Sequence, residues 1–389
     1  MPATDDRTAL AEAALRECMP HELPSTVTSV VGKHFGASSC RILLADYGLR
    51  FLAPVPTGAG EAVPVDGTAA GRAFASQEPV VVGGDPVTVY LPVSDRGERA
   101  GVLHVCLPAP GGTADPRDVE ALAGIAAAVA QTLMAVERDT DLYAVARRGR
   151  PLTLAAEIQW DLLPRRSAVR PEFHLGAQLE PAYTVCGDNF DWSADGDRLS
   201  IGVINGEGTG MPAATLTALA VQALRHARRT GADLADQAML ANEAVWAVHG
   251  GRRALSALLL EVDLATGQVQ AVDAGSPLAF LTRAGRSEQI SLEPQFTLGA
   301  LEDTVYTEQS FRLEPGDRLT VVSDGVHAAL SKTQEGTYRE RALARILRAT
   351  PLAPAPEAAR MILRDLAEHV GLIPLEDDAV VVCLDWFGR

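Results

Sequence analysis

The first third of the chain alternates between helical and strand-like patterns of apolar residues. An apolar repeat of about 3.6 residues predicts helices over 7–18 and 24–36. Strand-like runs follow at 40–47, 79–84 and 88–93, and the run 98–107 completes a hairpin across the turn at 94–97. This pattern predicts a compact sheet with flanking helices.

The residues from 116 to 148 form one long helical pattern. Leu122, Val129, Val136 and Tyr143 recur seven residues apart, which places them on one stripe of such a helix. Two interpretations remain open: the helix covers the sheet of its own domain, or it leaves the domain and pairs with a second copy in a homodimer. The segment "RRGRP" at 147–151 breaks the helix, and a second helical pattern covers 152–164.

The remainder of the chain is mostly antiparallel in pattern. The run 197–204 reads as a strand, followed by predicted helices over 212–229 and 233–248. A hairpin is expected over 254–275 with its turn at 265–267, then a strand within 311–326, two helices between 339 and 370, and a final strand within 377–386. The fold class is therefore α+β, with predicted domains at 1–115 and 171–389 joined by a helical linker at 116–170.

Composition narrows the class of protein. Apolar residues make up 47% and charged residues 22% of the 389 residues, as in globular domains. The net charge of −16 argues against nucleic acid and against an anionic membrane as partners. The five cysteines are widely spaced, and the N-terminal residues resemble no signal peptide, so we expect a cytoplasmic protein.

The loop "NGEGTG" at 205–210 lies between a predicted strand and a predicted helix. Gly208, Gly210 and Ala213 match a dinucleotide-binding fingerprint, but the strands that follow form a hairpin and not a parallel partner. A P-loop is excluded, because no Gly-Lys-Ser/Thr follows. The pair Asn205-Gly206 by itself is typical of a tight turn.

Acidic residues stand at other predicted strand ends of this half. Asp188 and Asp191 precede one strand, Asp324 follows another, and Glu376, Asp377 and Asp378 precede the last. Any one of them alone is more often a cap or a turn residue. Together they indicate an all-oxygen site for Mg²⁺ or Mn²⁺.

Four motifs in this order resemble one family. The stretches "GDNFD" (187–191), "NGEGTGMPAA" (205–214), "SDGV" (323–326) and "DDA" (377–379) resemble the SpoIIE/RsbU branch of the PPM-type metal-dependent protein serine/threonine phosphatases. The resemblance covers 180–387. Residues 20–115, with "GTAAGRAF" and "LPVSDRGERAGVLHV", look like a GAF sensory domain, although more loosely.

The resemblance implies an α-β-β-α sandwich with two divalent metals that activate a water for attack on phosphoserine or phosphothreonine. It places metal ligands at Asp188, Asp324, Asp377 and the backbone carbonyl of Gly206, and it places the catalytic ligand that bridges both metals at Asn205. A neutral amide removes a full charge there, so a weakened two-metal site is expected. Thr209, Ser276 and Ala328 are further departures from the family pattern, and Glu207 is the nearest acid that could substitute.

Two hypotheses follow from this resemblance. The first is a weak phosphatase under a GAF-like sensor, acting on a phosphorylated STAS-type anti-sigma-factor antagonist or a similar phosphoprotein. The second is a pseudophosphatase that binds such a partner without turnover. The GAF-like domain is expected to bind a small molecule that its residues do not identify. Cys40, Cys106 and His104 are interpreted as structural strand residues.

Overall fold

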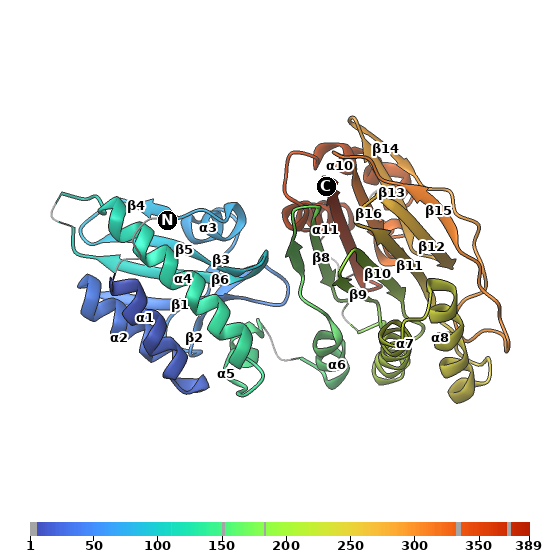
Figure 1. The fold of residues 1–389 in the computed structure, drawn as a ribbon, viewed down its shortest axis with the longest axis horizontal. Helices are drawn as coiled ribbons and strands as arrows, with labels where there is room; N and C mark the ends of the chain where they lie inside the picture. The colour runs from blue at the N-terminus through green and yellow to red at the C-terminus, as the bar shows by residue number, and fades with distance from the viewer. Residues whose placement is uncertain (1–5, 110, 150–151, 183, 332–335, 372–374) are drawn as a thin grey trace. The chain divides into compact units, whose positions relative to one another are not determined.

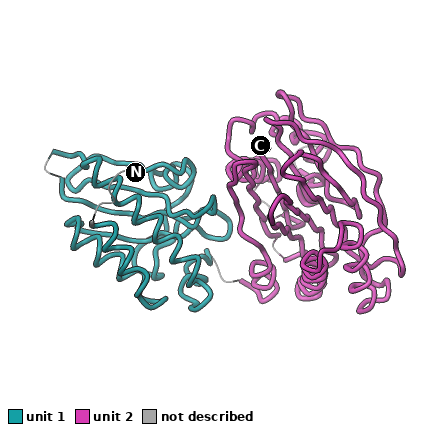
Figure 2. The backbone as a smooth tube through the Cα atoms, viewed as in Figure 1, with its two compact units in different colours: residues 1–151 teal, residues 152–389 magenta. Residues whose placement is uncertain are grey.

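The chain folds into two compact units, residues 1–151 and 152–389 (Figure 2). The structure is a computed structural model that describes residues 6–109, 111–149, 152–182, 184–331, 336–371 and 375–389. The predicted linker at 116–170 is divided between the two units. The last two residues of the predicted helix break at 147–151 lie outside the described residues.

The first unit is a six-stranded antiparallel sheet with helices on both faces (Figure 1). Helices α1, α2 and α4 contribute to one core on one face, and the short helix α3 packs in a second core with the other face. Strand order is β3-β2-β1-β6-β5-β4. The helices are α1 (Asp6–Glu17), η1 (Pro20–Glu22), α2 (Leu23–Phe35), α3 (Ala69–Ser76), α4 (Pro116–Val136) and α5 (Leu142–Arg147). The strands are β1 (Ser39–Ala45), β2 (Phe51–Val55), β3 (Val63–Pro64), β4 (Val80–Val82), β5 (Val87–Asp95) and β6 (Glu98–Leu107).

Alternating burial explains why β5 and β6 form the predicted hairpin. Val87, Val89, Leu91 and Val93 are fully buried in β5, and the residues between them are half-buried. A strand presents successive side chains to opposite faces, so this period of two directs one row of β5 into the core under α4.

The packing of helix α4 contradicts the interpretation of its apolar stripe as a dimer interface. Leu122, Val129 and Tyr143 are at most 1% exposed and belong to the core of the first unit, while Val136 packs against that core and is half-buried. The helix also ends at Val136, so Tyr143 lies in the separate helix α5. The stripe therefore covers the sheet of its own unit and is not free to form a dimer interface. Among the described residues, α4 is the one helix long and apolar enough to cross a membrane by length and composition, and its buried side belongs to the core of the first unit.

The second unit is a sandwich of two antiparallel sheets between layers of helices (Figure 1). Helices α7 and α8 pack on the sheet β15-β12-β11-β10-β9, and α10 and α11 pack on the sheet β14-β13-β16-β17-β8-β7. The helices are α6 (Leu154–Leu162), α7 (Met211–Arg229), α8 (Leu234–His249), α9 (Asp324–His327), η2 (Arg339–Leu343), α10 (Ala344–Ala349) and α11 (Ala355–Val370). The predicted α-β-β-α sandwich is confirmed.

The strands of the second unit include every strand predicted from 197 onward and several that the pattern did not predict. They are β7 (Ser167–Val169), β8 (Phe173–Glu180), β9 (Asn189–Asp195), β10 (Arg198–Asn205), β11 (Ser256–Asp263), β12 (Gln268–Ala274), β13 (Leu278–Arg283), β14 (Arg286–Gln289), β15 (Gln309–Arg312), β16 (Arg318–Val322) and β17 (Ala379–Trp386). The predicted turn at 265–267 joins β11 to β12. Gly267 adopts φ +73°, a conformation that favours glycine.

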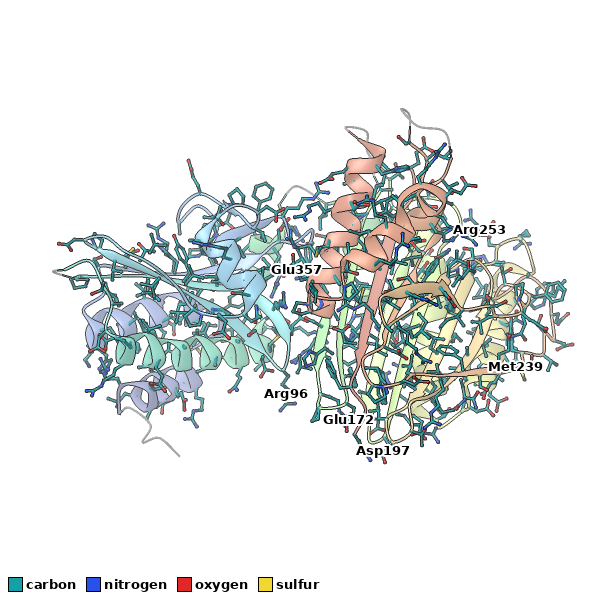
Figure 3. The ribbon with its side chains drawn as sticks, turned by 90° about the horizontal axis from the view of Figure 1, so that it is seen from above. Arg96, Glu172, Asp197, Met239, Arg253 and Glu357 are labelled. Atoms are coloured by element: carbon teal, nitrogen blue, oxygen red, sulfur yellow. The ribbon has the colours of Figure 1, made fainter. Side chains whose placement is uncertain are left out.

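An ion-pair group marks one end of this sandwich. Glu172 and Asp197 lie near each other in Figure 3, and both pair with Arg389 at the end of the chain. Asp197 lies in the turn between β9 and β10, so this group sits at the opposite end of β10 from Asn205. These pairs are partly exposed, and we assign them little stabilising energy.

Candidate functional site

Four of the predicted site residues lie at the same end of the sandwich because of strand register. Asn205 is the last residue of β10, and Asp188 directly precedes β9, whose Asn189 is paired with Ile204. In the other sheet, Asp324 follows β16 and Asp377 precedes β17, and these strands pair Val322 with Val381. Residues far apart in sequence are thus brought to one edge of the fold.

Asp188 is the most deeply placed of these carboxylates. It is 1% exposed, and its Oδ1 accepts a hydrogen bond from the backbone N–H of Gly206 at 3.1 Å. Its Oδ2 is buried and has no hydrogen-bond partner among the described residues. Burial raises the pKa of Asp188 well above its usual value, and the nearby charge of Asp324 adds to the shift. A buried carboxylate with one unpaired oxygen has the electrostatic character of a site for a cation.

Asn205 is held in a hydrogen-bonded chain with the loops that follow β12 and β16. Its Nδ2 donates to the hydroxyl of Ser276, and that hydroxyl donates to Oδ2 of Asp324 at 3.1 Å. An ionised carboxylate can only accept hydrogen bonds, so Ser276 must donate its single hydroxyl hydrogen to Asp324. The hydroxyl oxygen of Ser276 can then only accept, so the group of Asn205 that faces it must be a donor. The amide nitrogen therefore points at Ser276, while Oδ1 of Asn205 is buried without a hydrogen-bond partner in the described part of the chain.

Asp324 and Asp377 are half-buried and use one oxygen each in their own turns. Oδ1 of Asp324 accepts from the N–H of Gly325 at 2.9 Å, and Oδ1 of Asp377 accepts from the N–H of Asp378 at 2.8 Å. Burial raises the pKa of Asp377, and the nearby charge of Asp324 raises it further. Both oxygens of Asp324 thus accept hydrogen bonds, because its Oδ2 is the acceptor of the Ser276 hydroxyl.

Asp378 has a structural role. Its fully buried carboxylate accepts hydrogen bonds from the backbone N–H groups of Ala182, Cys186 and Gly187 at 2.8 Å each. It also accepts from Nε2 of Gln159 at 2.7 Å, and the same nitrogen donates to the carbonyl of Asp188 at 2.8 Å. Asp378 and Gln159 therefore position the loop that presents Asp188.

Asp191 is also structural. It pairs with Arg225 at 2.7 Å and with Arg228 at 3.0 Å, both from α7. The acidic motifs seen in the sequence thus separate into side chains that organise the fold and side chains that face the site.

Two glycines permit the loops to approach this closely. A Cβ atom on Gly206 would lie 2.3 Å from the carbonyl oxygen of Cys186, and one on Gly325 would lie 1.9 Å from the carbonyl oxygen of Asp378. No side chain fits at such distances from a backbone. The site therefore depends on direct packing between backbone segments.

The possible substitute acid Glu207 and the departures Thr209 and Ala328 belong to the loops next to these site residues. Glu207 is exposed and its Oε2 accepts from the N–H of Ala254 at 2.7 Å, so it is engaged away from the Asn205–Ser276–Asp324 chain. Thr209 and Ala328 are exposed.

Sequence reasoning missed Gln159 and His327 as residues of this region. Nε2 of His327 lies 3.0 Å from the carbonyl oxygen of Ser276, and burial lowers the pKa of His327. The neutral ring can donate to that carbonyl and fix the loop that carries Ser276. A histidine three residues after Asp324 was visible in the sequence, but its partner was not.

The residues suit a metal ion in donor type but not in arrangement. All the candidate ligands are oxygens, as Mg²⁺ and Mn²⁺ require, and the two unpaired oxygens of Asp188 and Asn205 are acceptors. However, within the described ranges no group of three or more His, Cys, Asp or Glu side chains is placed to hold a metal ion. The Asn205–Ser276–Asp324 chain uses groups that a two-metal centre would need.

Comparison with known families agrees with this architecture. The family model described as "Stage II sporulation protein E (SpoIIE)" matches residues 195–387, and the GAF domain model matches residues 20–133. No curated protein sequence matches the chain. The protein therefore combines a GAF domain with a SpoIIE-type phosphatase domain of the PPM fold, as the sequence motifs predicted.

The chain is also similar to solved structures. The chain is similar to the SiaA-PP2C domain of Pseudomonas aeruginosa, with 25% identity, a TM-score of 0.53, and coverage of 60% of this chain and 94% of that one. It also resembles the RsbU and RsbW domains of a Mycobacterium tuberculosis protein, with 24% identity and a TM-score of 0.49, covering 58% of this chain and 63% of that one. A SpoIIE structure from Bacillus subtilis covers 99% of this chain and 95% of that one at 14% identity and a TM-score of 0.49.

Proposed function

We propose that the second unit recognises a phosphorylated serine or threonine on a regulatory protein, and that its hydrolytic activity is impaired at Asn205. By family resemblance, the partner is a STAS-type anti-sigma-factor antagonist. The metal would be Mn²⁺ or Mg²⁺ with Asp188, Asp324, Asp377 and the carbonyl of Gly206 as its ligands, and binding would require these carboxylates to draw together from their positions in the structure. The GAF domain would control this unit through a small molecule whose chemistry we do not assign.

The observation that carries the proposal is the hydrogen bond from Asn205 to Ser276 and from Ser276 to Asp324. Two divalent ions about 4 Å apart repel each other by roughly 17 kcal/mol even at an effective dielectric constant of about 20. Bridging anions must offset that repulsion. An amide supplies no charge, and here its nitrogen faces Ser276, so a second metal ion has no strong ligand at this position.

A second candidate function is a pseudophosphatase that binds the phosphoprotein without hydrolysing it. Glu207 favours this reading, because its carboxylate is engaged with the N–H of Ala254 and is not placed to replace the missing charge. Binding through the remaining surface would survive the loss of turnover. The two candidates differ only in whether hydrolysis is measurable.

The substitution Asn205→Asp tests the proposal directly. Asp and Asn have nearly the same shape, so the change restores an anion without straining the turn. Mutation of a residue that only supports a metal ligand lowers metal affinity or activity by about 10–100-fold. Restoring a ligand itself should therefore raise kcat with Mn²⁺ by about 100-fold or more. The measurement is turnover of p-nitrophenyl phosphate, with a calorimetric Mn²⁺ titration that should change from fewer than two sites to two.

Glu207→Gln provides the matched control, because it removes a charge from the same loop without changing position 205. It should leave both turnover and Mn²⁺ binding unchanged. Brisk turnover by the unmodified protein, with no gain in Asn205→Asp, would contradict the impairment. Absence of turnover in both proteins would favour the pseudophosphatase. Peptide mapping should accompany each sample, since an Asn-Gly pair can deamidate to an acid on storage.

A further inference from the structure

Arg253 is a half-buried residue beside the candidate site whose side chain has no partner among the described residues. It lies in the segment between α8 and β11 and is labelled in Figure 3. Its side chain makes no hydrogen bond and no ion pair with any residue that the structure describes. A half-buried arginine commonly pairs its guanidinium with a carboxylate or a carbonyl.

Other arginines of the second unit follow that expectation. Arg225 and Arg228 pair with Asp191, and Arg318 pairs with Asp385 at 2.6 Å. Arg253 differs even though the protein has a net charge of −16 and acids are plentiful. Glu207, an acid of the adjacent loop, binds the N–H of Ala254 and leaves the Arg253 side chain unpaired.

Strand pairing places Arg253 at the rim of the site. Asn205 at the end of β10 pairs with Ser256 at the start of β11, so the segments 206–210 and 251–255 continue side by side beyond the two strands. A Cβ atom built on Gly208 would lie 2.9 Å from Nη1 of Arg253. Gly208 is only two residues from Gly206, a span of at most about 7 Å. A phosphate bound to this guanidinium would therefore also contact the loop 206–210, whose Gly206 N–H binds Asp188.

We propose that Arg253 binds the phosphate of the phosphoserine or phosphothreonine recognised by the second unit. The inference rests on the proposed function and adds the group that contacts the phosphate. A guanidinium presents paired N–H donors that match two phosphate oxygens, and it keeps its charge at any ordinary pH. Asp188, Asp324 and Asp377 would repel a phosphate carrying about −1.5 to −2 charges at pH 7, so a nearby cation is needed to hold it.

The amide at position 205 fits the same scheme. Replacing a bridging carboxylate by Asn205 removes one negative charge from the end of the sandwich that the phosphate must approach. Without a full metal centre, fewer carboxylates mean less repulsion of an anion. Arg253 and Asn205 would thus act in the same direction, toward binding a phosphate when hydrolysis is slow.

The experiment is a titration of metal-free protein with O-phosphoserine and with inorganic phosphate, followed by calorimetry or NMR. Arg253→Gln should weaken binding of both by about tenfold or more, and Arg253→Lys, which keeps the charge but loses the fork of donors, should fall between. Arg252→Gln is the matched control, because Arg252 is exposed and adjacent, and its substitution changes the net charge by the same amount. It should alter binding by less than about twofold. Since Arg253 holds no other group, its variants should melt at the wild-type temperature.

Three results would overturn the inference: no phosphate binding by the wild type, equal binding by Arg253→Gln and wild type, or equal losses in Arg252→Gln and Arg253→Gln. Acetate titrated in parallel separates a phosphate site from a general carboxylate site, and equal affinity for both anions would also overturn it. The outcome is independent of turnover. If Asn205→Asp hydrolyses nothing while phosphate binding still depends on Arg253, the hydrolytic proposal fails and this one stands.

Discussion

At the scale of single residues, neighbouring carboxylates in one motif have opposite roles. Asp378 points into the protein and satisfies buried N–H groups, whereas the preceding Asp377 is half-buried and faces the site. Consecutive residues entering a strand point to opposite sides, so one of the two had to be internal. Which one is internal follows from the N–H groups of Ala182, Cys186 and Gly187, which converge on Asp378.

We therefore expect Asp378→Asn to destabilise the second unit by about 3 kcal/mol, since it removes an acceptor from a buried network that includes Gln159 and Gly187. Asp377→Asn should instead raise the melting temperature slightly in the absence of metal. The pKa of Asp377 is raised, so its ionised form is unfavourable in the folded state at neutral pH, and neutralising it relieves that cost.

Urea unfolding and thermal unfolding of both variants at neutral pH, followed by far-UV circular dichroism, give the free energy of unfolding and the melting temperature that test these expectations. Equal destabilisation by the two substitutions would mean that the structural and site-facing roles are not separated in this way.

Sequence reasoning found the residues of this end of the sandwich but not their connections. The four motifs predicted that Asp188, Asn205, Asp324 and Asp377 lie at strand ends, and the structure places them there. The hydrogen bond between Asn205 and Ser276 joins positions 71 residues apart. No local pattern encodes such a partner, because the pairing depends on how the loops after β10 and β12 pack.

At the scale of elements, α4 illustrates how one periodic pattern serves two structures. A seven-residue apolar spacing suits a coiled-coil seam and equally suits a helix lying on a sheet. The strand β5 beneath it supplies fully buried residues such as Val89 and Leu91, which complete the core with Val129. The surrounding surface therefore decided the role of the stripe.

The buried position of Val129 leads to a prediction about this helix. Val129→Glu should unfold the first unit, with a loss of more than about 4 kcal/mol, because it buries an unpaired charge. Val145→Glu on α5 is the control, since Val145 is 44% exposed and should tolerate the change. Sedimentation and circular dichroism distinguish the outcomes: a folded Val129→Glu monomer would restore the interpretation of α4 as a dimer seam.

At the scale of the whole molecule, each unit has its own hydrophobic cores. One set is built from α1, α2, α3 and α4 with the six-stranded sheet, and the other from the helices and two sheets of the sandwich. Each unit exceeds the size at which a domain can support an independent core.

Fragments 1–151 and 152–389 should therefore each fold when produced alone. Each should show a cooperative thermal transition by circular dichroism, and the two transitions should reproduce those of the full chain to within a few degrees. A fragment that lacks a cooperative transition would show that its core depends on the other unit. The Asp378→Asn variant should shift only the transition of fragment 152–389.

The sequence by itself determined most of the helices, the strands of the second half from β10 onward in outline, the order of the motifs and the presence of an amide at Asn205, because these depend on local periodicity and residue chemistry. Tertiary structure alone decided that α4 faces its own sheet, that Asp378 is internal, and that Arg253 lies beside Gly208. Each of these depends on contacts between segments tens to hundreds of residues apart. Such contacts are set by register and by the close packing of backbones at glycines, which no window of neighbouring residues contains.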